Sequence, residues 1–187
     1  MEAKITYFDK PGSGNTAAAL RLARQRAGEL GIKQVVLAST HGTTALAAAD
    51  VFHGSGVELI AVSISAAFGP EGWTMTPEER RQAEARGVRV LTSQHGLADG
   101  VAEGFMGGST PGTVMAETLR CFSQGLKVAV EVSIMAAEAG WVQAGREIVA
   151  LGGTNDGADT AVVLRPAFAR RVKELVVCEL LCKPRVP

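Results

Sequence analysis

The stretch VVLASTHGTTALAAA, residues 35–49, contains a complete change of secondary structure. Its apolar first part is typical of a buried strand, and its Ala-rich last part is typical of a helix. A strand that turns directly into a helix leaves backbone N–H groups unpaired and directs them, with the helix dipole, at one point that attracts anions. This argument predicts a phosphate or carboxylate cradle at Ser39, Thr40, His41, Gly42, Thr43 and Thr44. The alternative interpretation is an ordinary helix start that is capped by Thr43 or Ser39.

Strands and helices also alternate along the chain on both sides of this stretch. Helices are predicted from residue 15 or 16 to 30, from Thr76 to about 86 and over 113–122, and residues 93–110 are predicted to be irregular. This alternation predicts right-handed crossovers and a three-layer α/β/α sandwich with a mostly parallel sheet, in one domain covering residues 1–187. Further strands are predicted over 5–8, 57–65, 88–92, 147–151, 160–164 and 175–181, the last completing the sheet at an edge.

One apolar run has two interpretations. Residues 126–134 carry a large apolar side chain at every second position, which indicates a strand. Val128, Val132, Met135 and Ala139 also fall on one helical stripe. Periodicity alone favours the strand.

Composition excludes several classes of protein. The chain has 187 residues, 47% hydrophobic and 20% charged, and its 19 basic and 19 acidic residues cancel. No global field recruits nucleic acid or an anionic membrane surface, and we expect a cytoplasmic protein without a membrane segment. The odd number of cysteines without a C-x-x-C pattern argues against disulfides and zinc, and buried, reduced thiols are expected at Cys121, Cys178 and Cys182.

Two further loops share the chemistry of the first, since they are rich in glycine and in hydroxyl or amide side chains. They would lie at the carboxyl ends of strands, where ligands of open α/β sheets bind. Neutral donors of this kind suit a phosphorylated ligand. The candidate binding residues are Gly12, Gly14, Asn15 and Thr16 in one loop and Gly152, Gly153, Thr154, Asn155, Asp156 and Gly157 in the other.

Known nucleotide motifs fit poorly. The pattern Gly12-x-Gly14-x-x-Ala17 resembles a dinucleotide fingerprint, but Ser39 and Thr40 stand where the ribose-binding acid belongs. No Walker-type loop is present, and the three histidines show no metal-ligand spacing.

Several single residues have a functional and a structural interpretation. His41 can donate to a phosphate or be a solvated loop histidine. The acids Asp9, Asp156 and Asp159 can act as acid, base or ribose contact, or cap loops. Phe68 and Trp73 can stack on a planar ring or close the core over a loop.

Three blocks of the chain resemble the pyruvate kinase C-terminal α/β domain, and in particular a family of small stand-alone archaeal and bacterial proteins with this domain. The blocks are residues 7–12 (YFDKPG), 126–137 (LKVAVEVSIMAA) and 157–163 (GADTAVV), and the loop at Ser39–Thr44 resembles the sugar-phosphate loop of pyruvate kinase. The likeness covers nearly the whole chain.

The resemblance implies a helix over 126–139 in place of the strand, and it implies FMN as the cofactor. It implies no pyruvate kinase activity, because the catalytic barrel with its metal and phosphoenolpyruvate groups is missing. A regulatory module that senses a phosphorylated metabolite through a homo-oligomer or partner is the second expectation. A flavoenzyme with Asp9, His41 or Glu131 near the ring is the third, although no residue is assigned a catalytic role.

Overall fold

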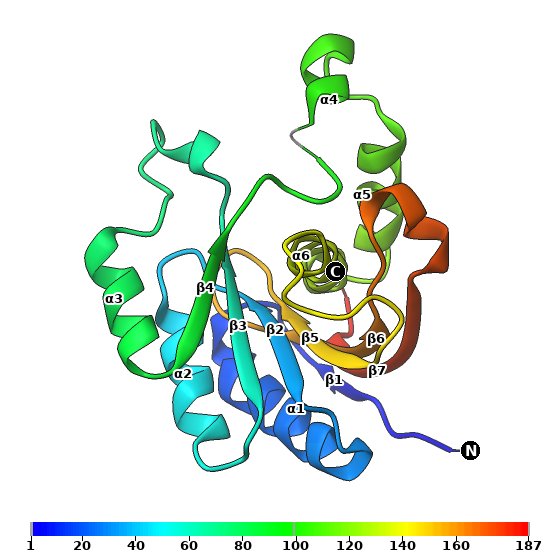
Figure 1. Cartoon of the computed structure of the whole chain (residues 1–187). Coiled ribbons are helices and arrows are strands. Elements are labelled where there is room, and N and C mark those ends of the chain that lie inside the picture. Colours follow the sequence, from blue (N-terminus) through cyan, green and yellow to red (C-terminus); the bar gives the residue numbers. More distant parts are fainter. Residues whose placement is uncertain (1, 99, 187) are drawn as a thin grey trace.

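A single seven-stranded sheet forms the centre of the protein, in a computed structural model that describes residues 2–98 and 100–186 (Figure 1). The strand order is β1-β7-β6-β5-β2-β3-β4, and β6 is the one described strand that runs antiparallel to its neighbours. The strands are β1 (Thr6–Phe8), β2 (Gln34–Ala38), β3 (Glu58–Ser63), β4 (Val88–Thr92), β5 (Ile148–Gly152), β6 (Thr160–Arg165) and β7 (Val176–Pro184). The prediction of a mostly parallel sheet is confirmed.

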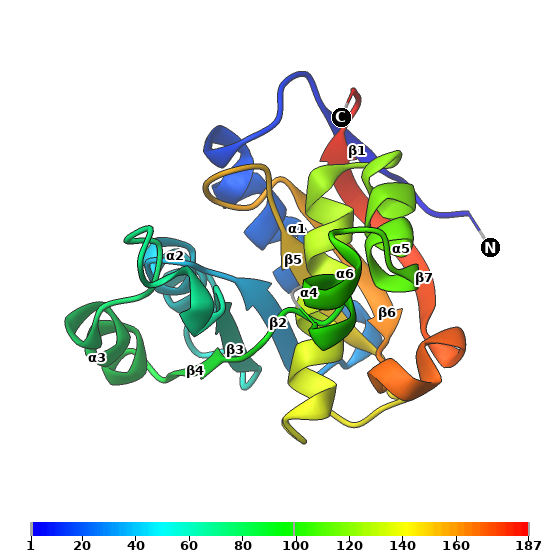
Figure 2. The ribbon, with the colours of Figure 1, turned by 90° about the horizontal axis from the view of Figure 1, so that it is seen from above.

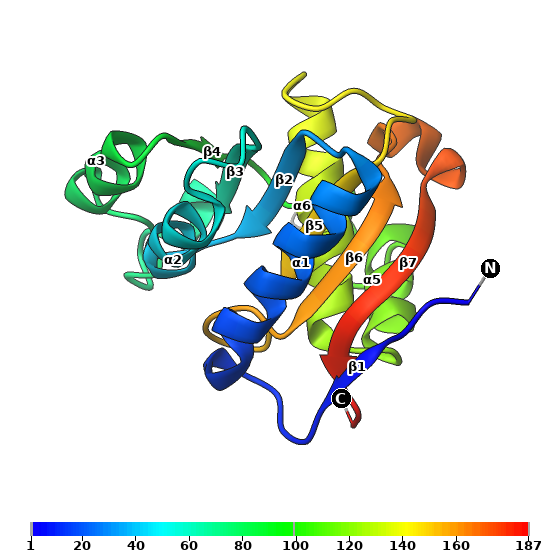
Figure 3. The same ribbon diagram turned by 90° about the horizontal axis from the view of Figure 1, so that it is seen from below.

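Helices cover both faces of the sheet, which confirms the three-layer α/β/α sandwich (Figures 2 and 3). The helices α1, α2 and α3 lie on one face, and α5 and α6 lie on the other. Met1, Asp99 and Pro187, which the single-domain prediction includes, lie outside the described residues. The helices are α1 (Thr16–Leu30), α2 (Thr43–Phe52), α3 (Pro77–Ala85), α4 (Val101–Met106), α5 (Pro111–Arg120) and α6 (Gln124–Glu138).

Two expectations about element positions were wrong. The strand expected over 175–181 is β7, but it lies between β1 and β6, because the short N-terminal strand pairs with it and takes the edge. Residues 93–110 are not irregular throughout, since they contain α4, and the six-residue η3 turn Ala169–Glu174 was not expected.

The helix α6 replaces the strand that alternation indicated for residues 126–134. It packs on the sheet with one side and on α5 with another, and most of its residues from Gly125 to Ala137 are buried. A helix that is covered nearly all round carries apolar residues on all sides, and its sequence then also fits a strand pattern. The helix implied by the resemblance is confirmed.

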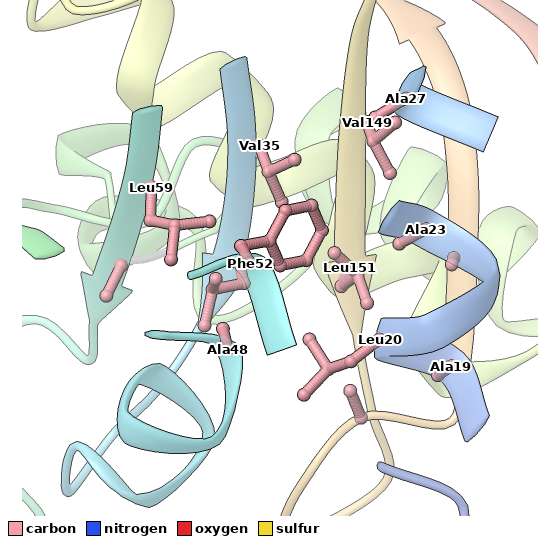
Figure 4. Close-up of a cluster of buried hydrophobic side chains, with 14 of the residues drawn as sticks. Ala19, Leu20, Ala23, Ala27, Val35, Ala48, Phe52, Leu59, Val149 and Leu151 are labelled. Atoms are coloured by element: carbon pink, nitrogen blue, oxygen red, sulfur yellow. The ribbon is translucent and has the colours of Figure 1, made fainter. Parts of the chain in front are cut away.

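The core consists of two apolar clusters separated by the sheet. Alternate residues of one strand enter different clusters: Val35 and Leu37 of β2 face α1 and α2, whereas Val36 faces α6. Figure 4 shows Phe52 of α2 among Val35, Leu59 and Leu151 of three neighbouring strands.

Cysteine burial differs from the prediction for two of three residues. Cys182 is buried, whereas Cys121 and Cys178 are exposed. Burial raises the pKa of the Cys182 thiol to about 12. Among the described residues, no helix has both the length and the apolar character that crossing a membrane requires.

Candidate functional site

The topology brings most of the candidate residues to one edge of the sheet. Six strands run in the same direction, so the segments after β1, β2, β3, β4 and β5 leave the sheet at their shared carboxyl end. Because β6 is reversed, its first residues lie at the same edge. Along this edge, the predicted loops separate into two groups with different contacts.

The loops around Gly12 and Gly152–Gly157 contact each other around one buried carboxylate. Asp159 is 0% exposed, and its Oδ2 accepts the backbone N–H of Gly12 at 2.9 Å and that of Thr154 at 3.2 Å. Thr16 accepts the N–H of Ala158 through its hydroxyl at 3.0 Å. One backbone donor of each loop is therefore used inside the protein, where it binds Asp159.

Close packing fixes this arrangement. Gly157 has a φ of +74°, and a Cβ on it would lie 2.3 Å from Oγ1 of Thr16 and 2.7 Å from Cα of Ser13. A Cβ on Gly153 would lie 2.2 Å from the carbonyl oxygen of Gly157. Gly157 is required by contact between the two loops, and Gly153 is required by contact within its own loop, whichever molecule binds nearby.

The start of α6 also reaches Asp159. Thr160 donates its hydroxyl to Oδ1 of Asp159 at 2.9 Å, and Ser123, which caps α6, lies with its hydroxyl 3.1 Å from that of Thr160. A Cβ on Gly152 would lie 2.3 Å from the carbonyl oxygen of Gly125. Asp159 thus joins β1, β5, β6 and α6 as a structural residue.

The remaining residues of these two loops are peripheral. Asn15 donates its amide to the carbonyl oxygens of Lys10 and Gly12, and a Cβ on Gly14 would meet nothing within 4 Å. Asn155 is exposed with a φ of 60°, and Asp156 is exposed. Asp9 is also exposed.

The Ser39–Thr44 loop is different, because the start of α2 keeps unpaired donors. Ser39 holds the loop: its N–H donates to Val62 at 3.0 Å, and its hydroxyl accepts the N–H of Ala45 at 3.1 Å. Gly42 is the N-cap residue, with a φ of 81° and no side chain to cap the helix. Within the part of the chain that the structure describes, the N–H groups of Thr43 and Thr44 have no hydrogen-bond partner.

The side chains of this loop differ in accessibility. His41 and Thr43 are exposed, Thr40 is half-buried, and Thr44 is buried. The ordinary interpretation, a cap by Ser39, is correct for one donor, that of Ala45. Among the described residues, the N–H groups of Thr43 and Thr44 in the first helical turn meet no acceptor.

The start of α3 borders this loop. A Cβ on Gly42 would lie 3.6 Å from the carbonyl oxygen of Glu79 and 4.0 Å from Cε of Met75. Glu79 forms a capping box with Thr76, and its Oε2 lies 3.4 Å from Nδ1 of His41. Hydrogen bonds from the backbone and hydroxyl of Thr76, with a smaller effect of His41, lower the pKa of Glu79, so a negative charge stands at the rim of the loop.

An aromatic cluster follows β3 and β4 at the same edge. Phe68 and Trp73 stack with ring centroids 5.8 Å apart and planes 10° apart, and His95 lies 5.4 Å from Phe68 at 48°. Trp73 remains 53% exposed. The sequence analysis named Phe68 and Trp73 as candidates for ring stacking but considered His95 only as a metal ligand, although it lies just after a predicted strand.

A buried ion pair lies on α6, next to the chain segment that follows β4. Lys127 pairs with Glu131, and both are less than 10% exposed. Glu131 also accepts the N–H of Leu97 through Oε1 at 3.2 Å, which ties the chain after β4 to α6. The sequence analysis named Glu131 but not Lys127, although lysine and glutamate four residues apart in an apolar run were a readable signal.

Two surface hollows lie elsewhere. One is bordered by α3, the β4 strand and Trp141, and the other lies between α1 and α2. Neither hollow includes a residue of the three predicted loops. Among the described residues, no group of His, Cys, Asp and Glu could hold a metal ion.

Comparison with known proteins gives one family. The chain matches the family described as pyruvate kinase, alpha/beta domain, over residues 17–164. It is similar to two solved structures of pyruvate kinase from Cryptosporidium parvum, at 17% and 16% identity and TM-scores of 0.45 and 0.43. Each match covers 84% of this chain and 24% or 23% of the pyruvate kinase, so the chain spans about a quarter of their length. The match over residues 17–164 shows that the chain belongs to the pyruvate kinase alpha/beta domain family.

Proposed function

We propose that the protein binds FMN through its phosphate group, which sits at the start of α2. The observation that carries this proposal is the pair of unpaired N–H groups on Thr43 and Thr44. A phosphate monoester supplies charged acceptors for both, and charge-assisted hydrogen bonds of this kind are the strong ones. The hydroxyls of Thr40 and Thr43 are further donors beside them.

The surroundings of the loop support a phosphate ester as the ligand. Gly42 has no side chain that could cap the first helical turn, and the dipole of the ten-residue helix α2 favours negative charge. The ionised Glu79 limits where that charge can lie, because it stands beside His41. We therefore place the phosphate on the Thr43 side of the loop, with His41 between it and Glu79.

The test is a titration of the flavin-free protein with FMN, followed by flavin fluorescence and calorimetry. Riboflavin, inorganic phosphate and glucose 6-phosphate serve as comparison ligands. Saturable binding of FMN at micromolar concentration, with riboflavin binding more weakly, supports the proposal. Failure of FMN to bind contradicts it, and binding of glucose 6-phosphate alone supports the regulatory module that senses a phosphorylated metabolite.

The variant Thr43→Glu tests the position of the phosphate. A carboxylate at the first helical turn replaces the anion and repels it, so FMN affinity should fall about tenfold while riboflavin affinity stays the same. The helix dipole accepts the new charge, so the variant should fold. Thr118→Glu is the matched control, because it adds the same charge at an exposed position of α5.

A further inference from the structure

We infer that Trp73, backed by Phe68, is the platform on which the flat ring of the ligand stacks. The inference rests on the proposed function and deepens it, since it defines the ligand class as phosphate esters of planar heteroaromatic groups. A plain sugar phosphate would leave this platform unused. Three observations support it: the fixed geometry of the aromatic pair, its exposure, and its position beside the phosphate loop.

The aromatic pair is held in place before any ligand arrives. Phe68 donates its N–H to the carbonyl of Ser65 at 3.1 Å, and Trp73 donates its N–H to the carbonyl of Phe68 at 3.3 Å. The Ser65 hydroxyl accepts the N–H of Ala67 at 3.3 Å and caps the short turn that carries Phe68. A preorganised stack loses little conformational freedom when a third ring joins it.

The pair is not part of the core. Neither Phe68 nor Trp73 belongs to the apolar cluster on either face of the sheet. Phe68 covers one face of the Trp73 indole, and 53% of Trp73 is still exposed. An indole in this state presents a free surface to a planar ring, and offset stacking is the favoured contact of such rings.

The platform borders the phosphate loop. The strands β2 and β3 are neighbours, and Ser39 at the end of β2 donates to Val62 of β3. Met75 reaches Gly42, with its Cε 4.0 Å from a Cβ built there. Trp73 is two residues before Met75, so their Cα atoms are at most about 7 Å apart. A ligand whose phosphate sits on Thr43 and Thr44 can therefore extend toward Trp73 without crossing the sheet.

The two tryptophans of the chain provide a matched pair of variants. Trp141 packs under Arg89 at 4.1 Å, and its carbonyl accepts the amide of Gln34, the first residue of β2. It therefore lies at the amino end of the strands, at the opposite edge from Trp73. Trp73→Ala removes the platform, Trp73→Phe keeps an aromatic ring, and Trp141→Phe is the control.

The experiment measures affinities for FMN and for ribose 5-phosphate, together with the fluorescence of bound FMN, in the full chain. We expect Trp73→Ala to lower FMN affinity about tenfold, to leave ribose 5-phosphate affinity unchanged and to increase the emission of bound flavin. Trp73→Phe should restore most of the affinity, and Trp141→Phe should behave as the wild type. Because Trp73 is exposed, the melting temperature of the variant should stay close to that of the wild type.

The outcomes separate this inference from the proposed function. If Trp73→Ala binds FMN with wild-type affinity and wild-type flavin emission while Thr43→Glu weakens binding, the platform is wrong and the phosphate site stands. If the wild type does not bind FMN at all, the proposed function fails and the platform fails with it. An equal loss of ribose 5-phosphate and FMN affinity in Trp73→Ala also overturns the platform, because it indicates damage to the phosphate loop.

Discussion

Two parts of the sheet edge have similar compositions but differ in whether their backbone N–H groups are paired. One consists of the loops around Gly12 and Thr154, and the other is the loop around Thr43. In the first pair, two backbone N–H groups donate to Asp159, a carboxylate that the protein supplies itself. In the Thr43 loop, two backbone N–H groups find no acceptor in the part of the chain that the structure describes. The buried Asp159 occupies the position that an anionic ligand would take, so a glycine-rich loop indicates an anion site only where the protein brings no anion of its own.

The largest effect is expected from Asp159→Ala, which removes the internal anion. Two half-buried N–H groups lose their acceptor at a fully buried position, and the free energy of unfolding should fall by about 4 kcal/mol. Urea denaturation measures it, and Asp156→Ala, an exposed acid of the same loop, should stay within about 0.5 kcal/mol of the wild type. An effect of Asp159→Ala as small as this control would show that the loops do not depend on the carboxylate.

The second prediction compares two glycines with similar backbone angles. Gly157 and Gly42 both have positive φ, but a Cβ overlaps Thr16 and Ser13 at Gly157, whereas at Gly42 its nearest contact is 3.6 Å. Gly157→Ala adds overpacking to backbone strain and should cost about 3 kcal/mol, against about 1 kcal/mol for Gly42→Ala. Thermal or urea unfolding of both variants measures the difference, and equal losses would contradict the close contact between the loops.

A smaller effect is expected on ligand affinity from Glu79→Gln. This change removes the negative charge at the rim of the open loop and keeps an acceptor for the Thr76 cap. FMN and inorganic phosphate should both bind more tightly, and the gain should shrink as salt is added. Glu84→Gln, on the far end of α3, is the control, and a salt-independent gain would show that the effect is not electrostatic.

The smallest effect is a pH dependence of stability that also comes from Glu79. Hydrogen bonds from Thr76 hold its pKa below the ordinary value of 4.5, so the folded state prefers the ionised carboxylate. This contribution is present above pH 4.5 and is lost as the pH falls through the lowered pKa. The difference in unfolding free energy between wild type and Glu79→Gln should therefore vanish in acid, and a difference that persists there would contradict the cap.

Much of the fold could be predicted from the sequence, because burial patterns and helix signals are local. Thr76, Pro77 and Glu79 indicate a helix start, and the structure contains that capping box. The helix α6 could not be predicted from periodicity, since its burial on several sides removes the polar stripe that identifies a helix. Only the resemblance to a known domain corrected it.

The site could be predicted only in part, for a different reason. The sequence shows which residues can donate hydrogen bonds, but it does not show which donors find a partner within the protein. Asp159 was one of three candidate acids, and nothing local distinguished it from Asp9 or Asp156, which are exposed. His95 and Glu131 make their contacts only because the topology places the segment after β4 beside Phe68 and α6.

Because β6 is reversed, Asp159 lies at the carboxyl edge of the other strands. This edge then has one half that is tied to Asp159 and one that is not, so the two halves can change independently in evolution. On the side of β1, β5 and β6, hydrogen bonds and close glycine contacts make each residue depend on several others, so single substitutions are costly. On the side of β2, β3 and β4, the segment 64–75 is mostly exposed, and insertions there disturb few contacts. A new ligand preference can therefore arise through the loops after β3 and β4 while the other half keeps the domain folded.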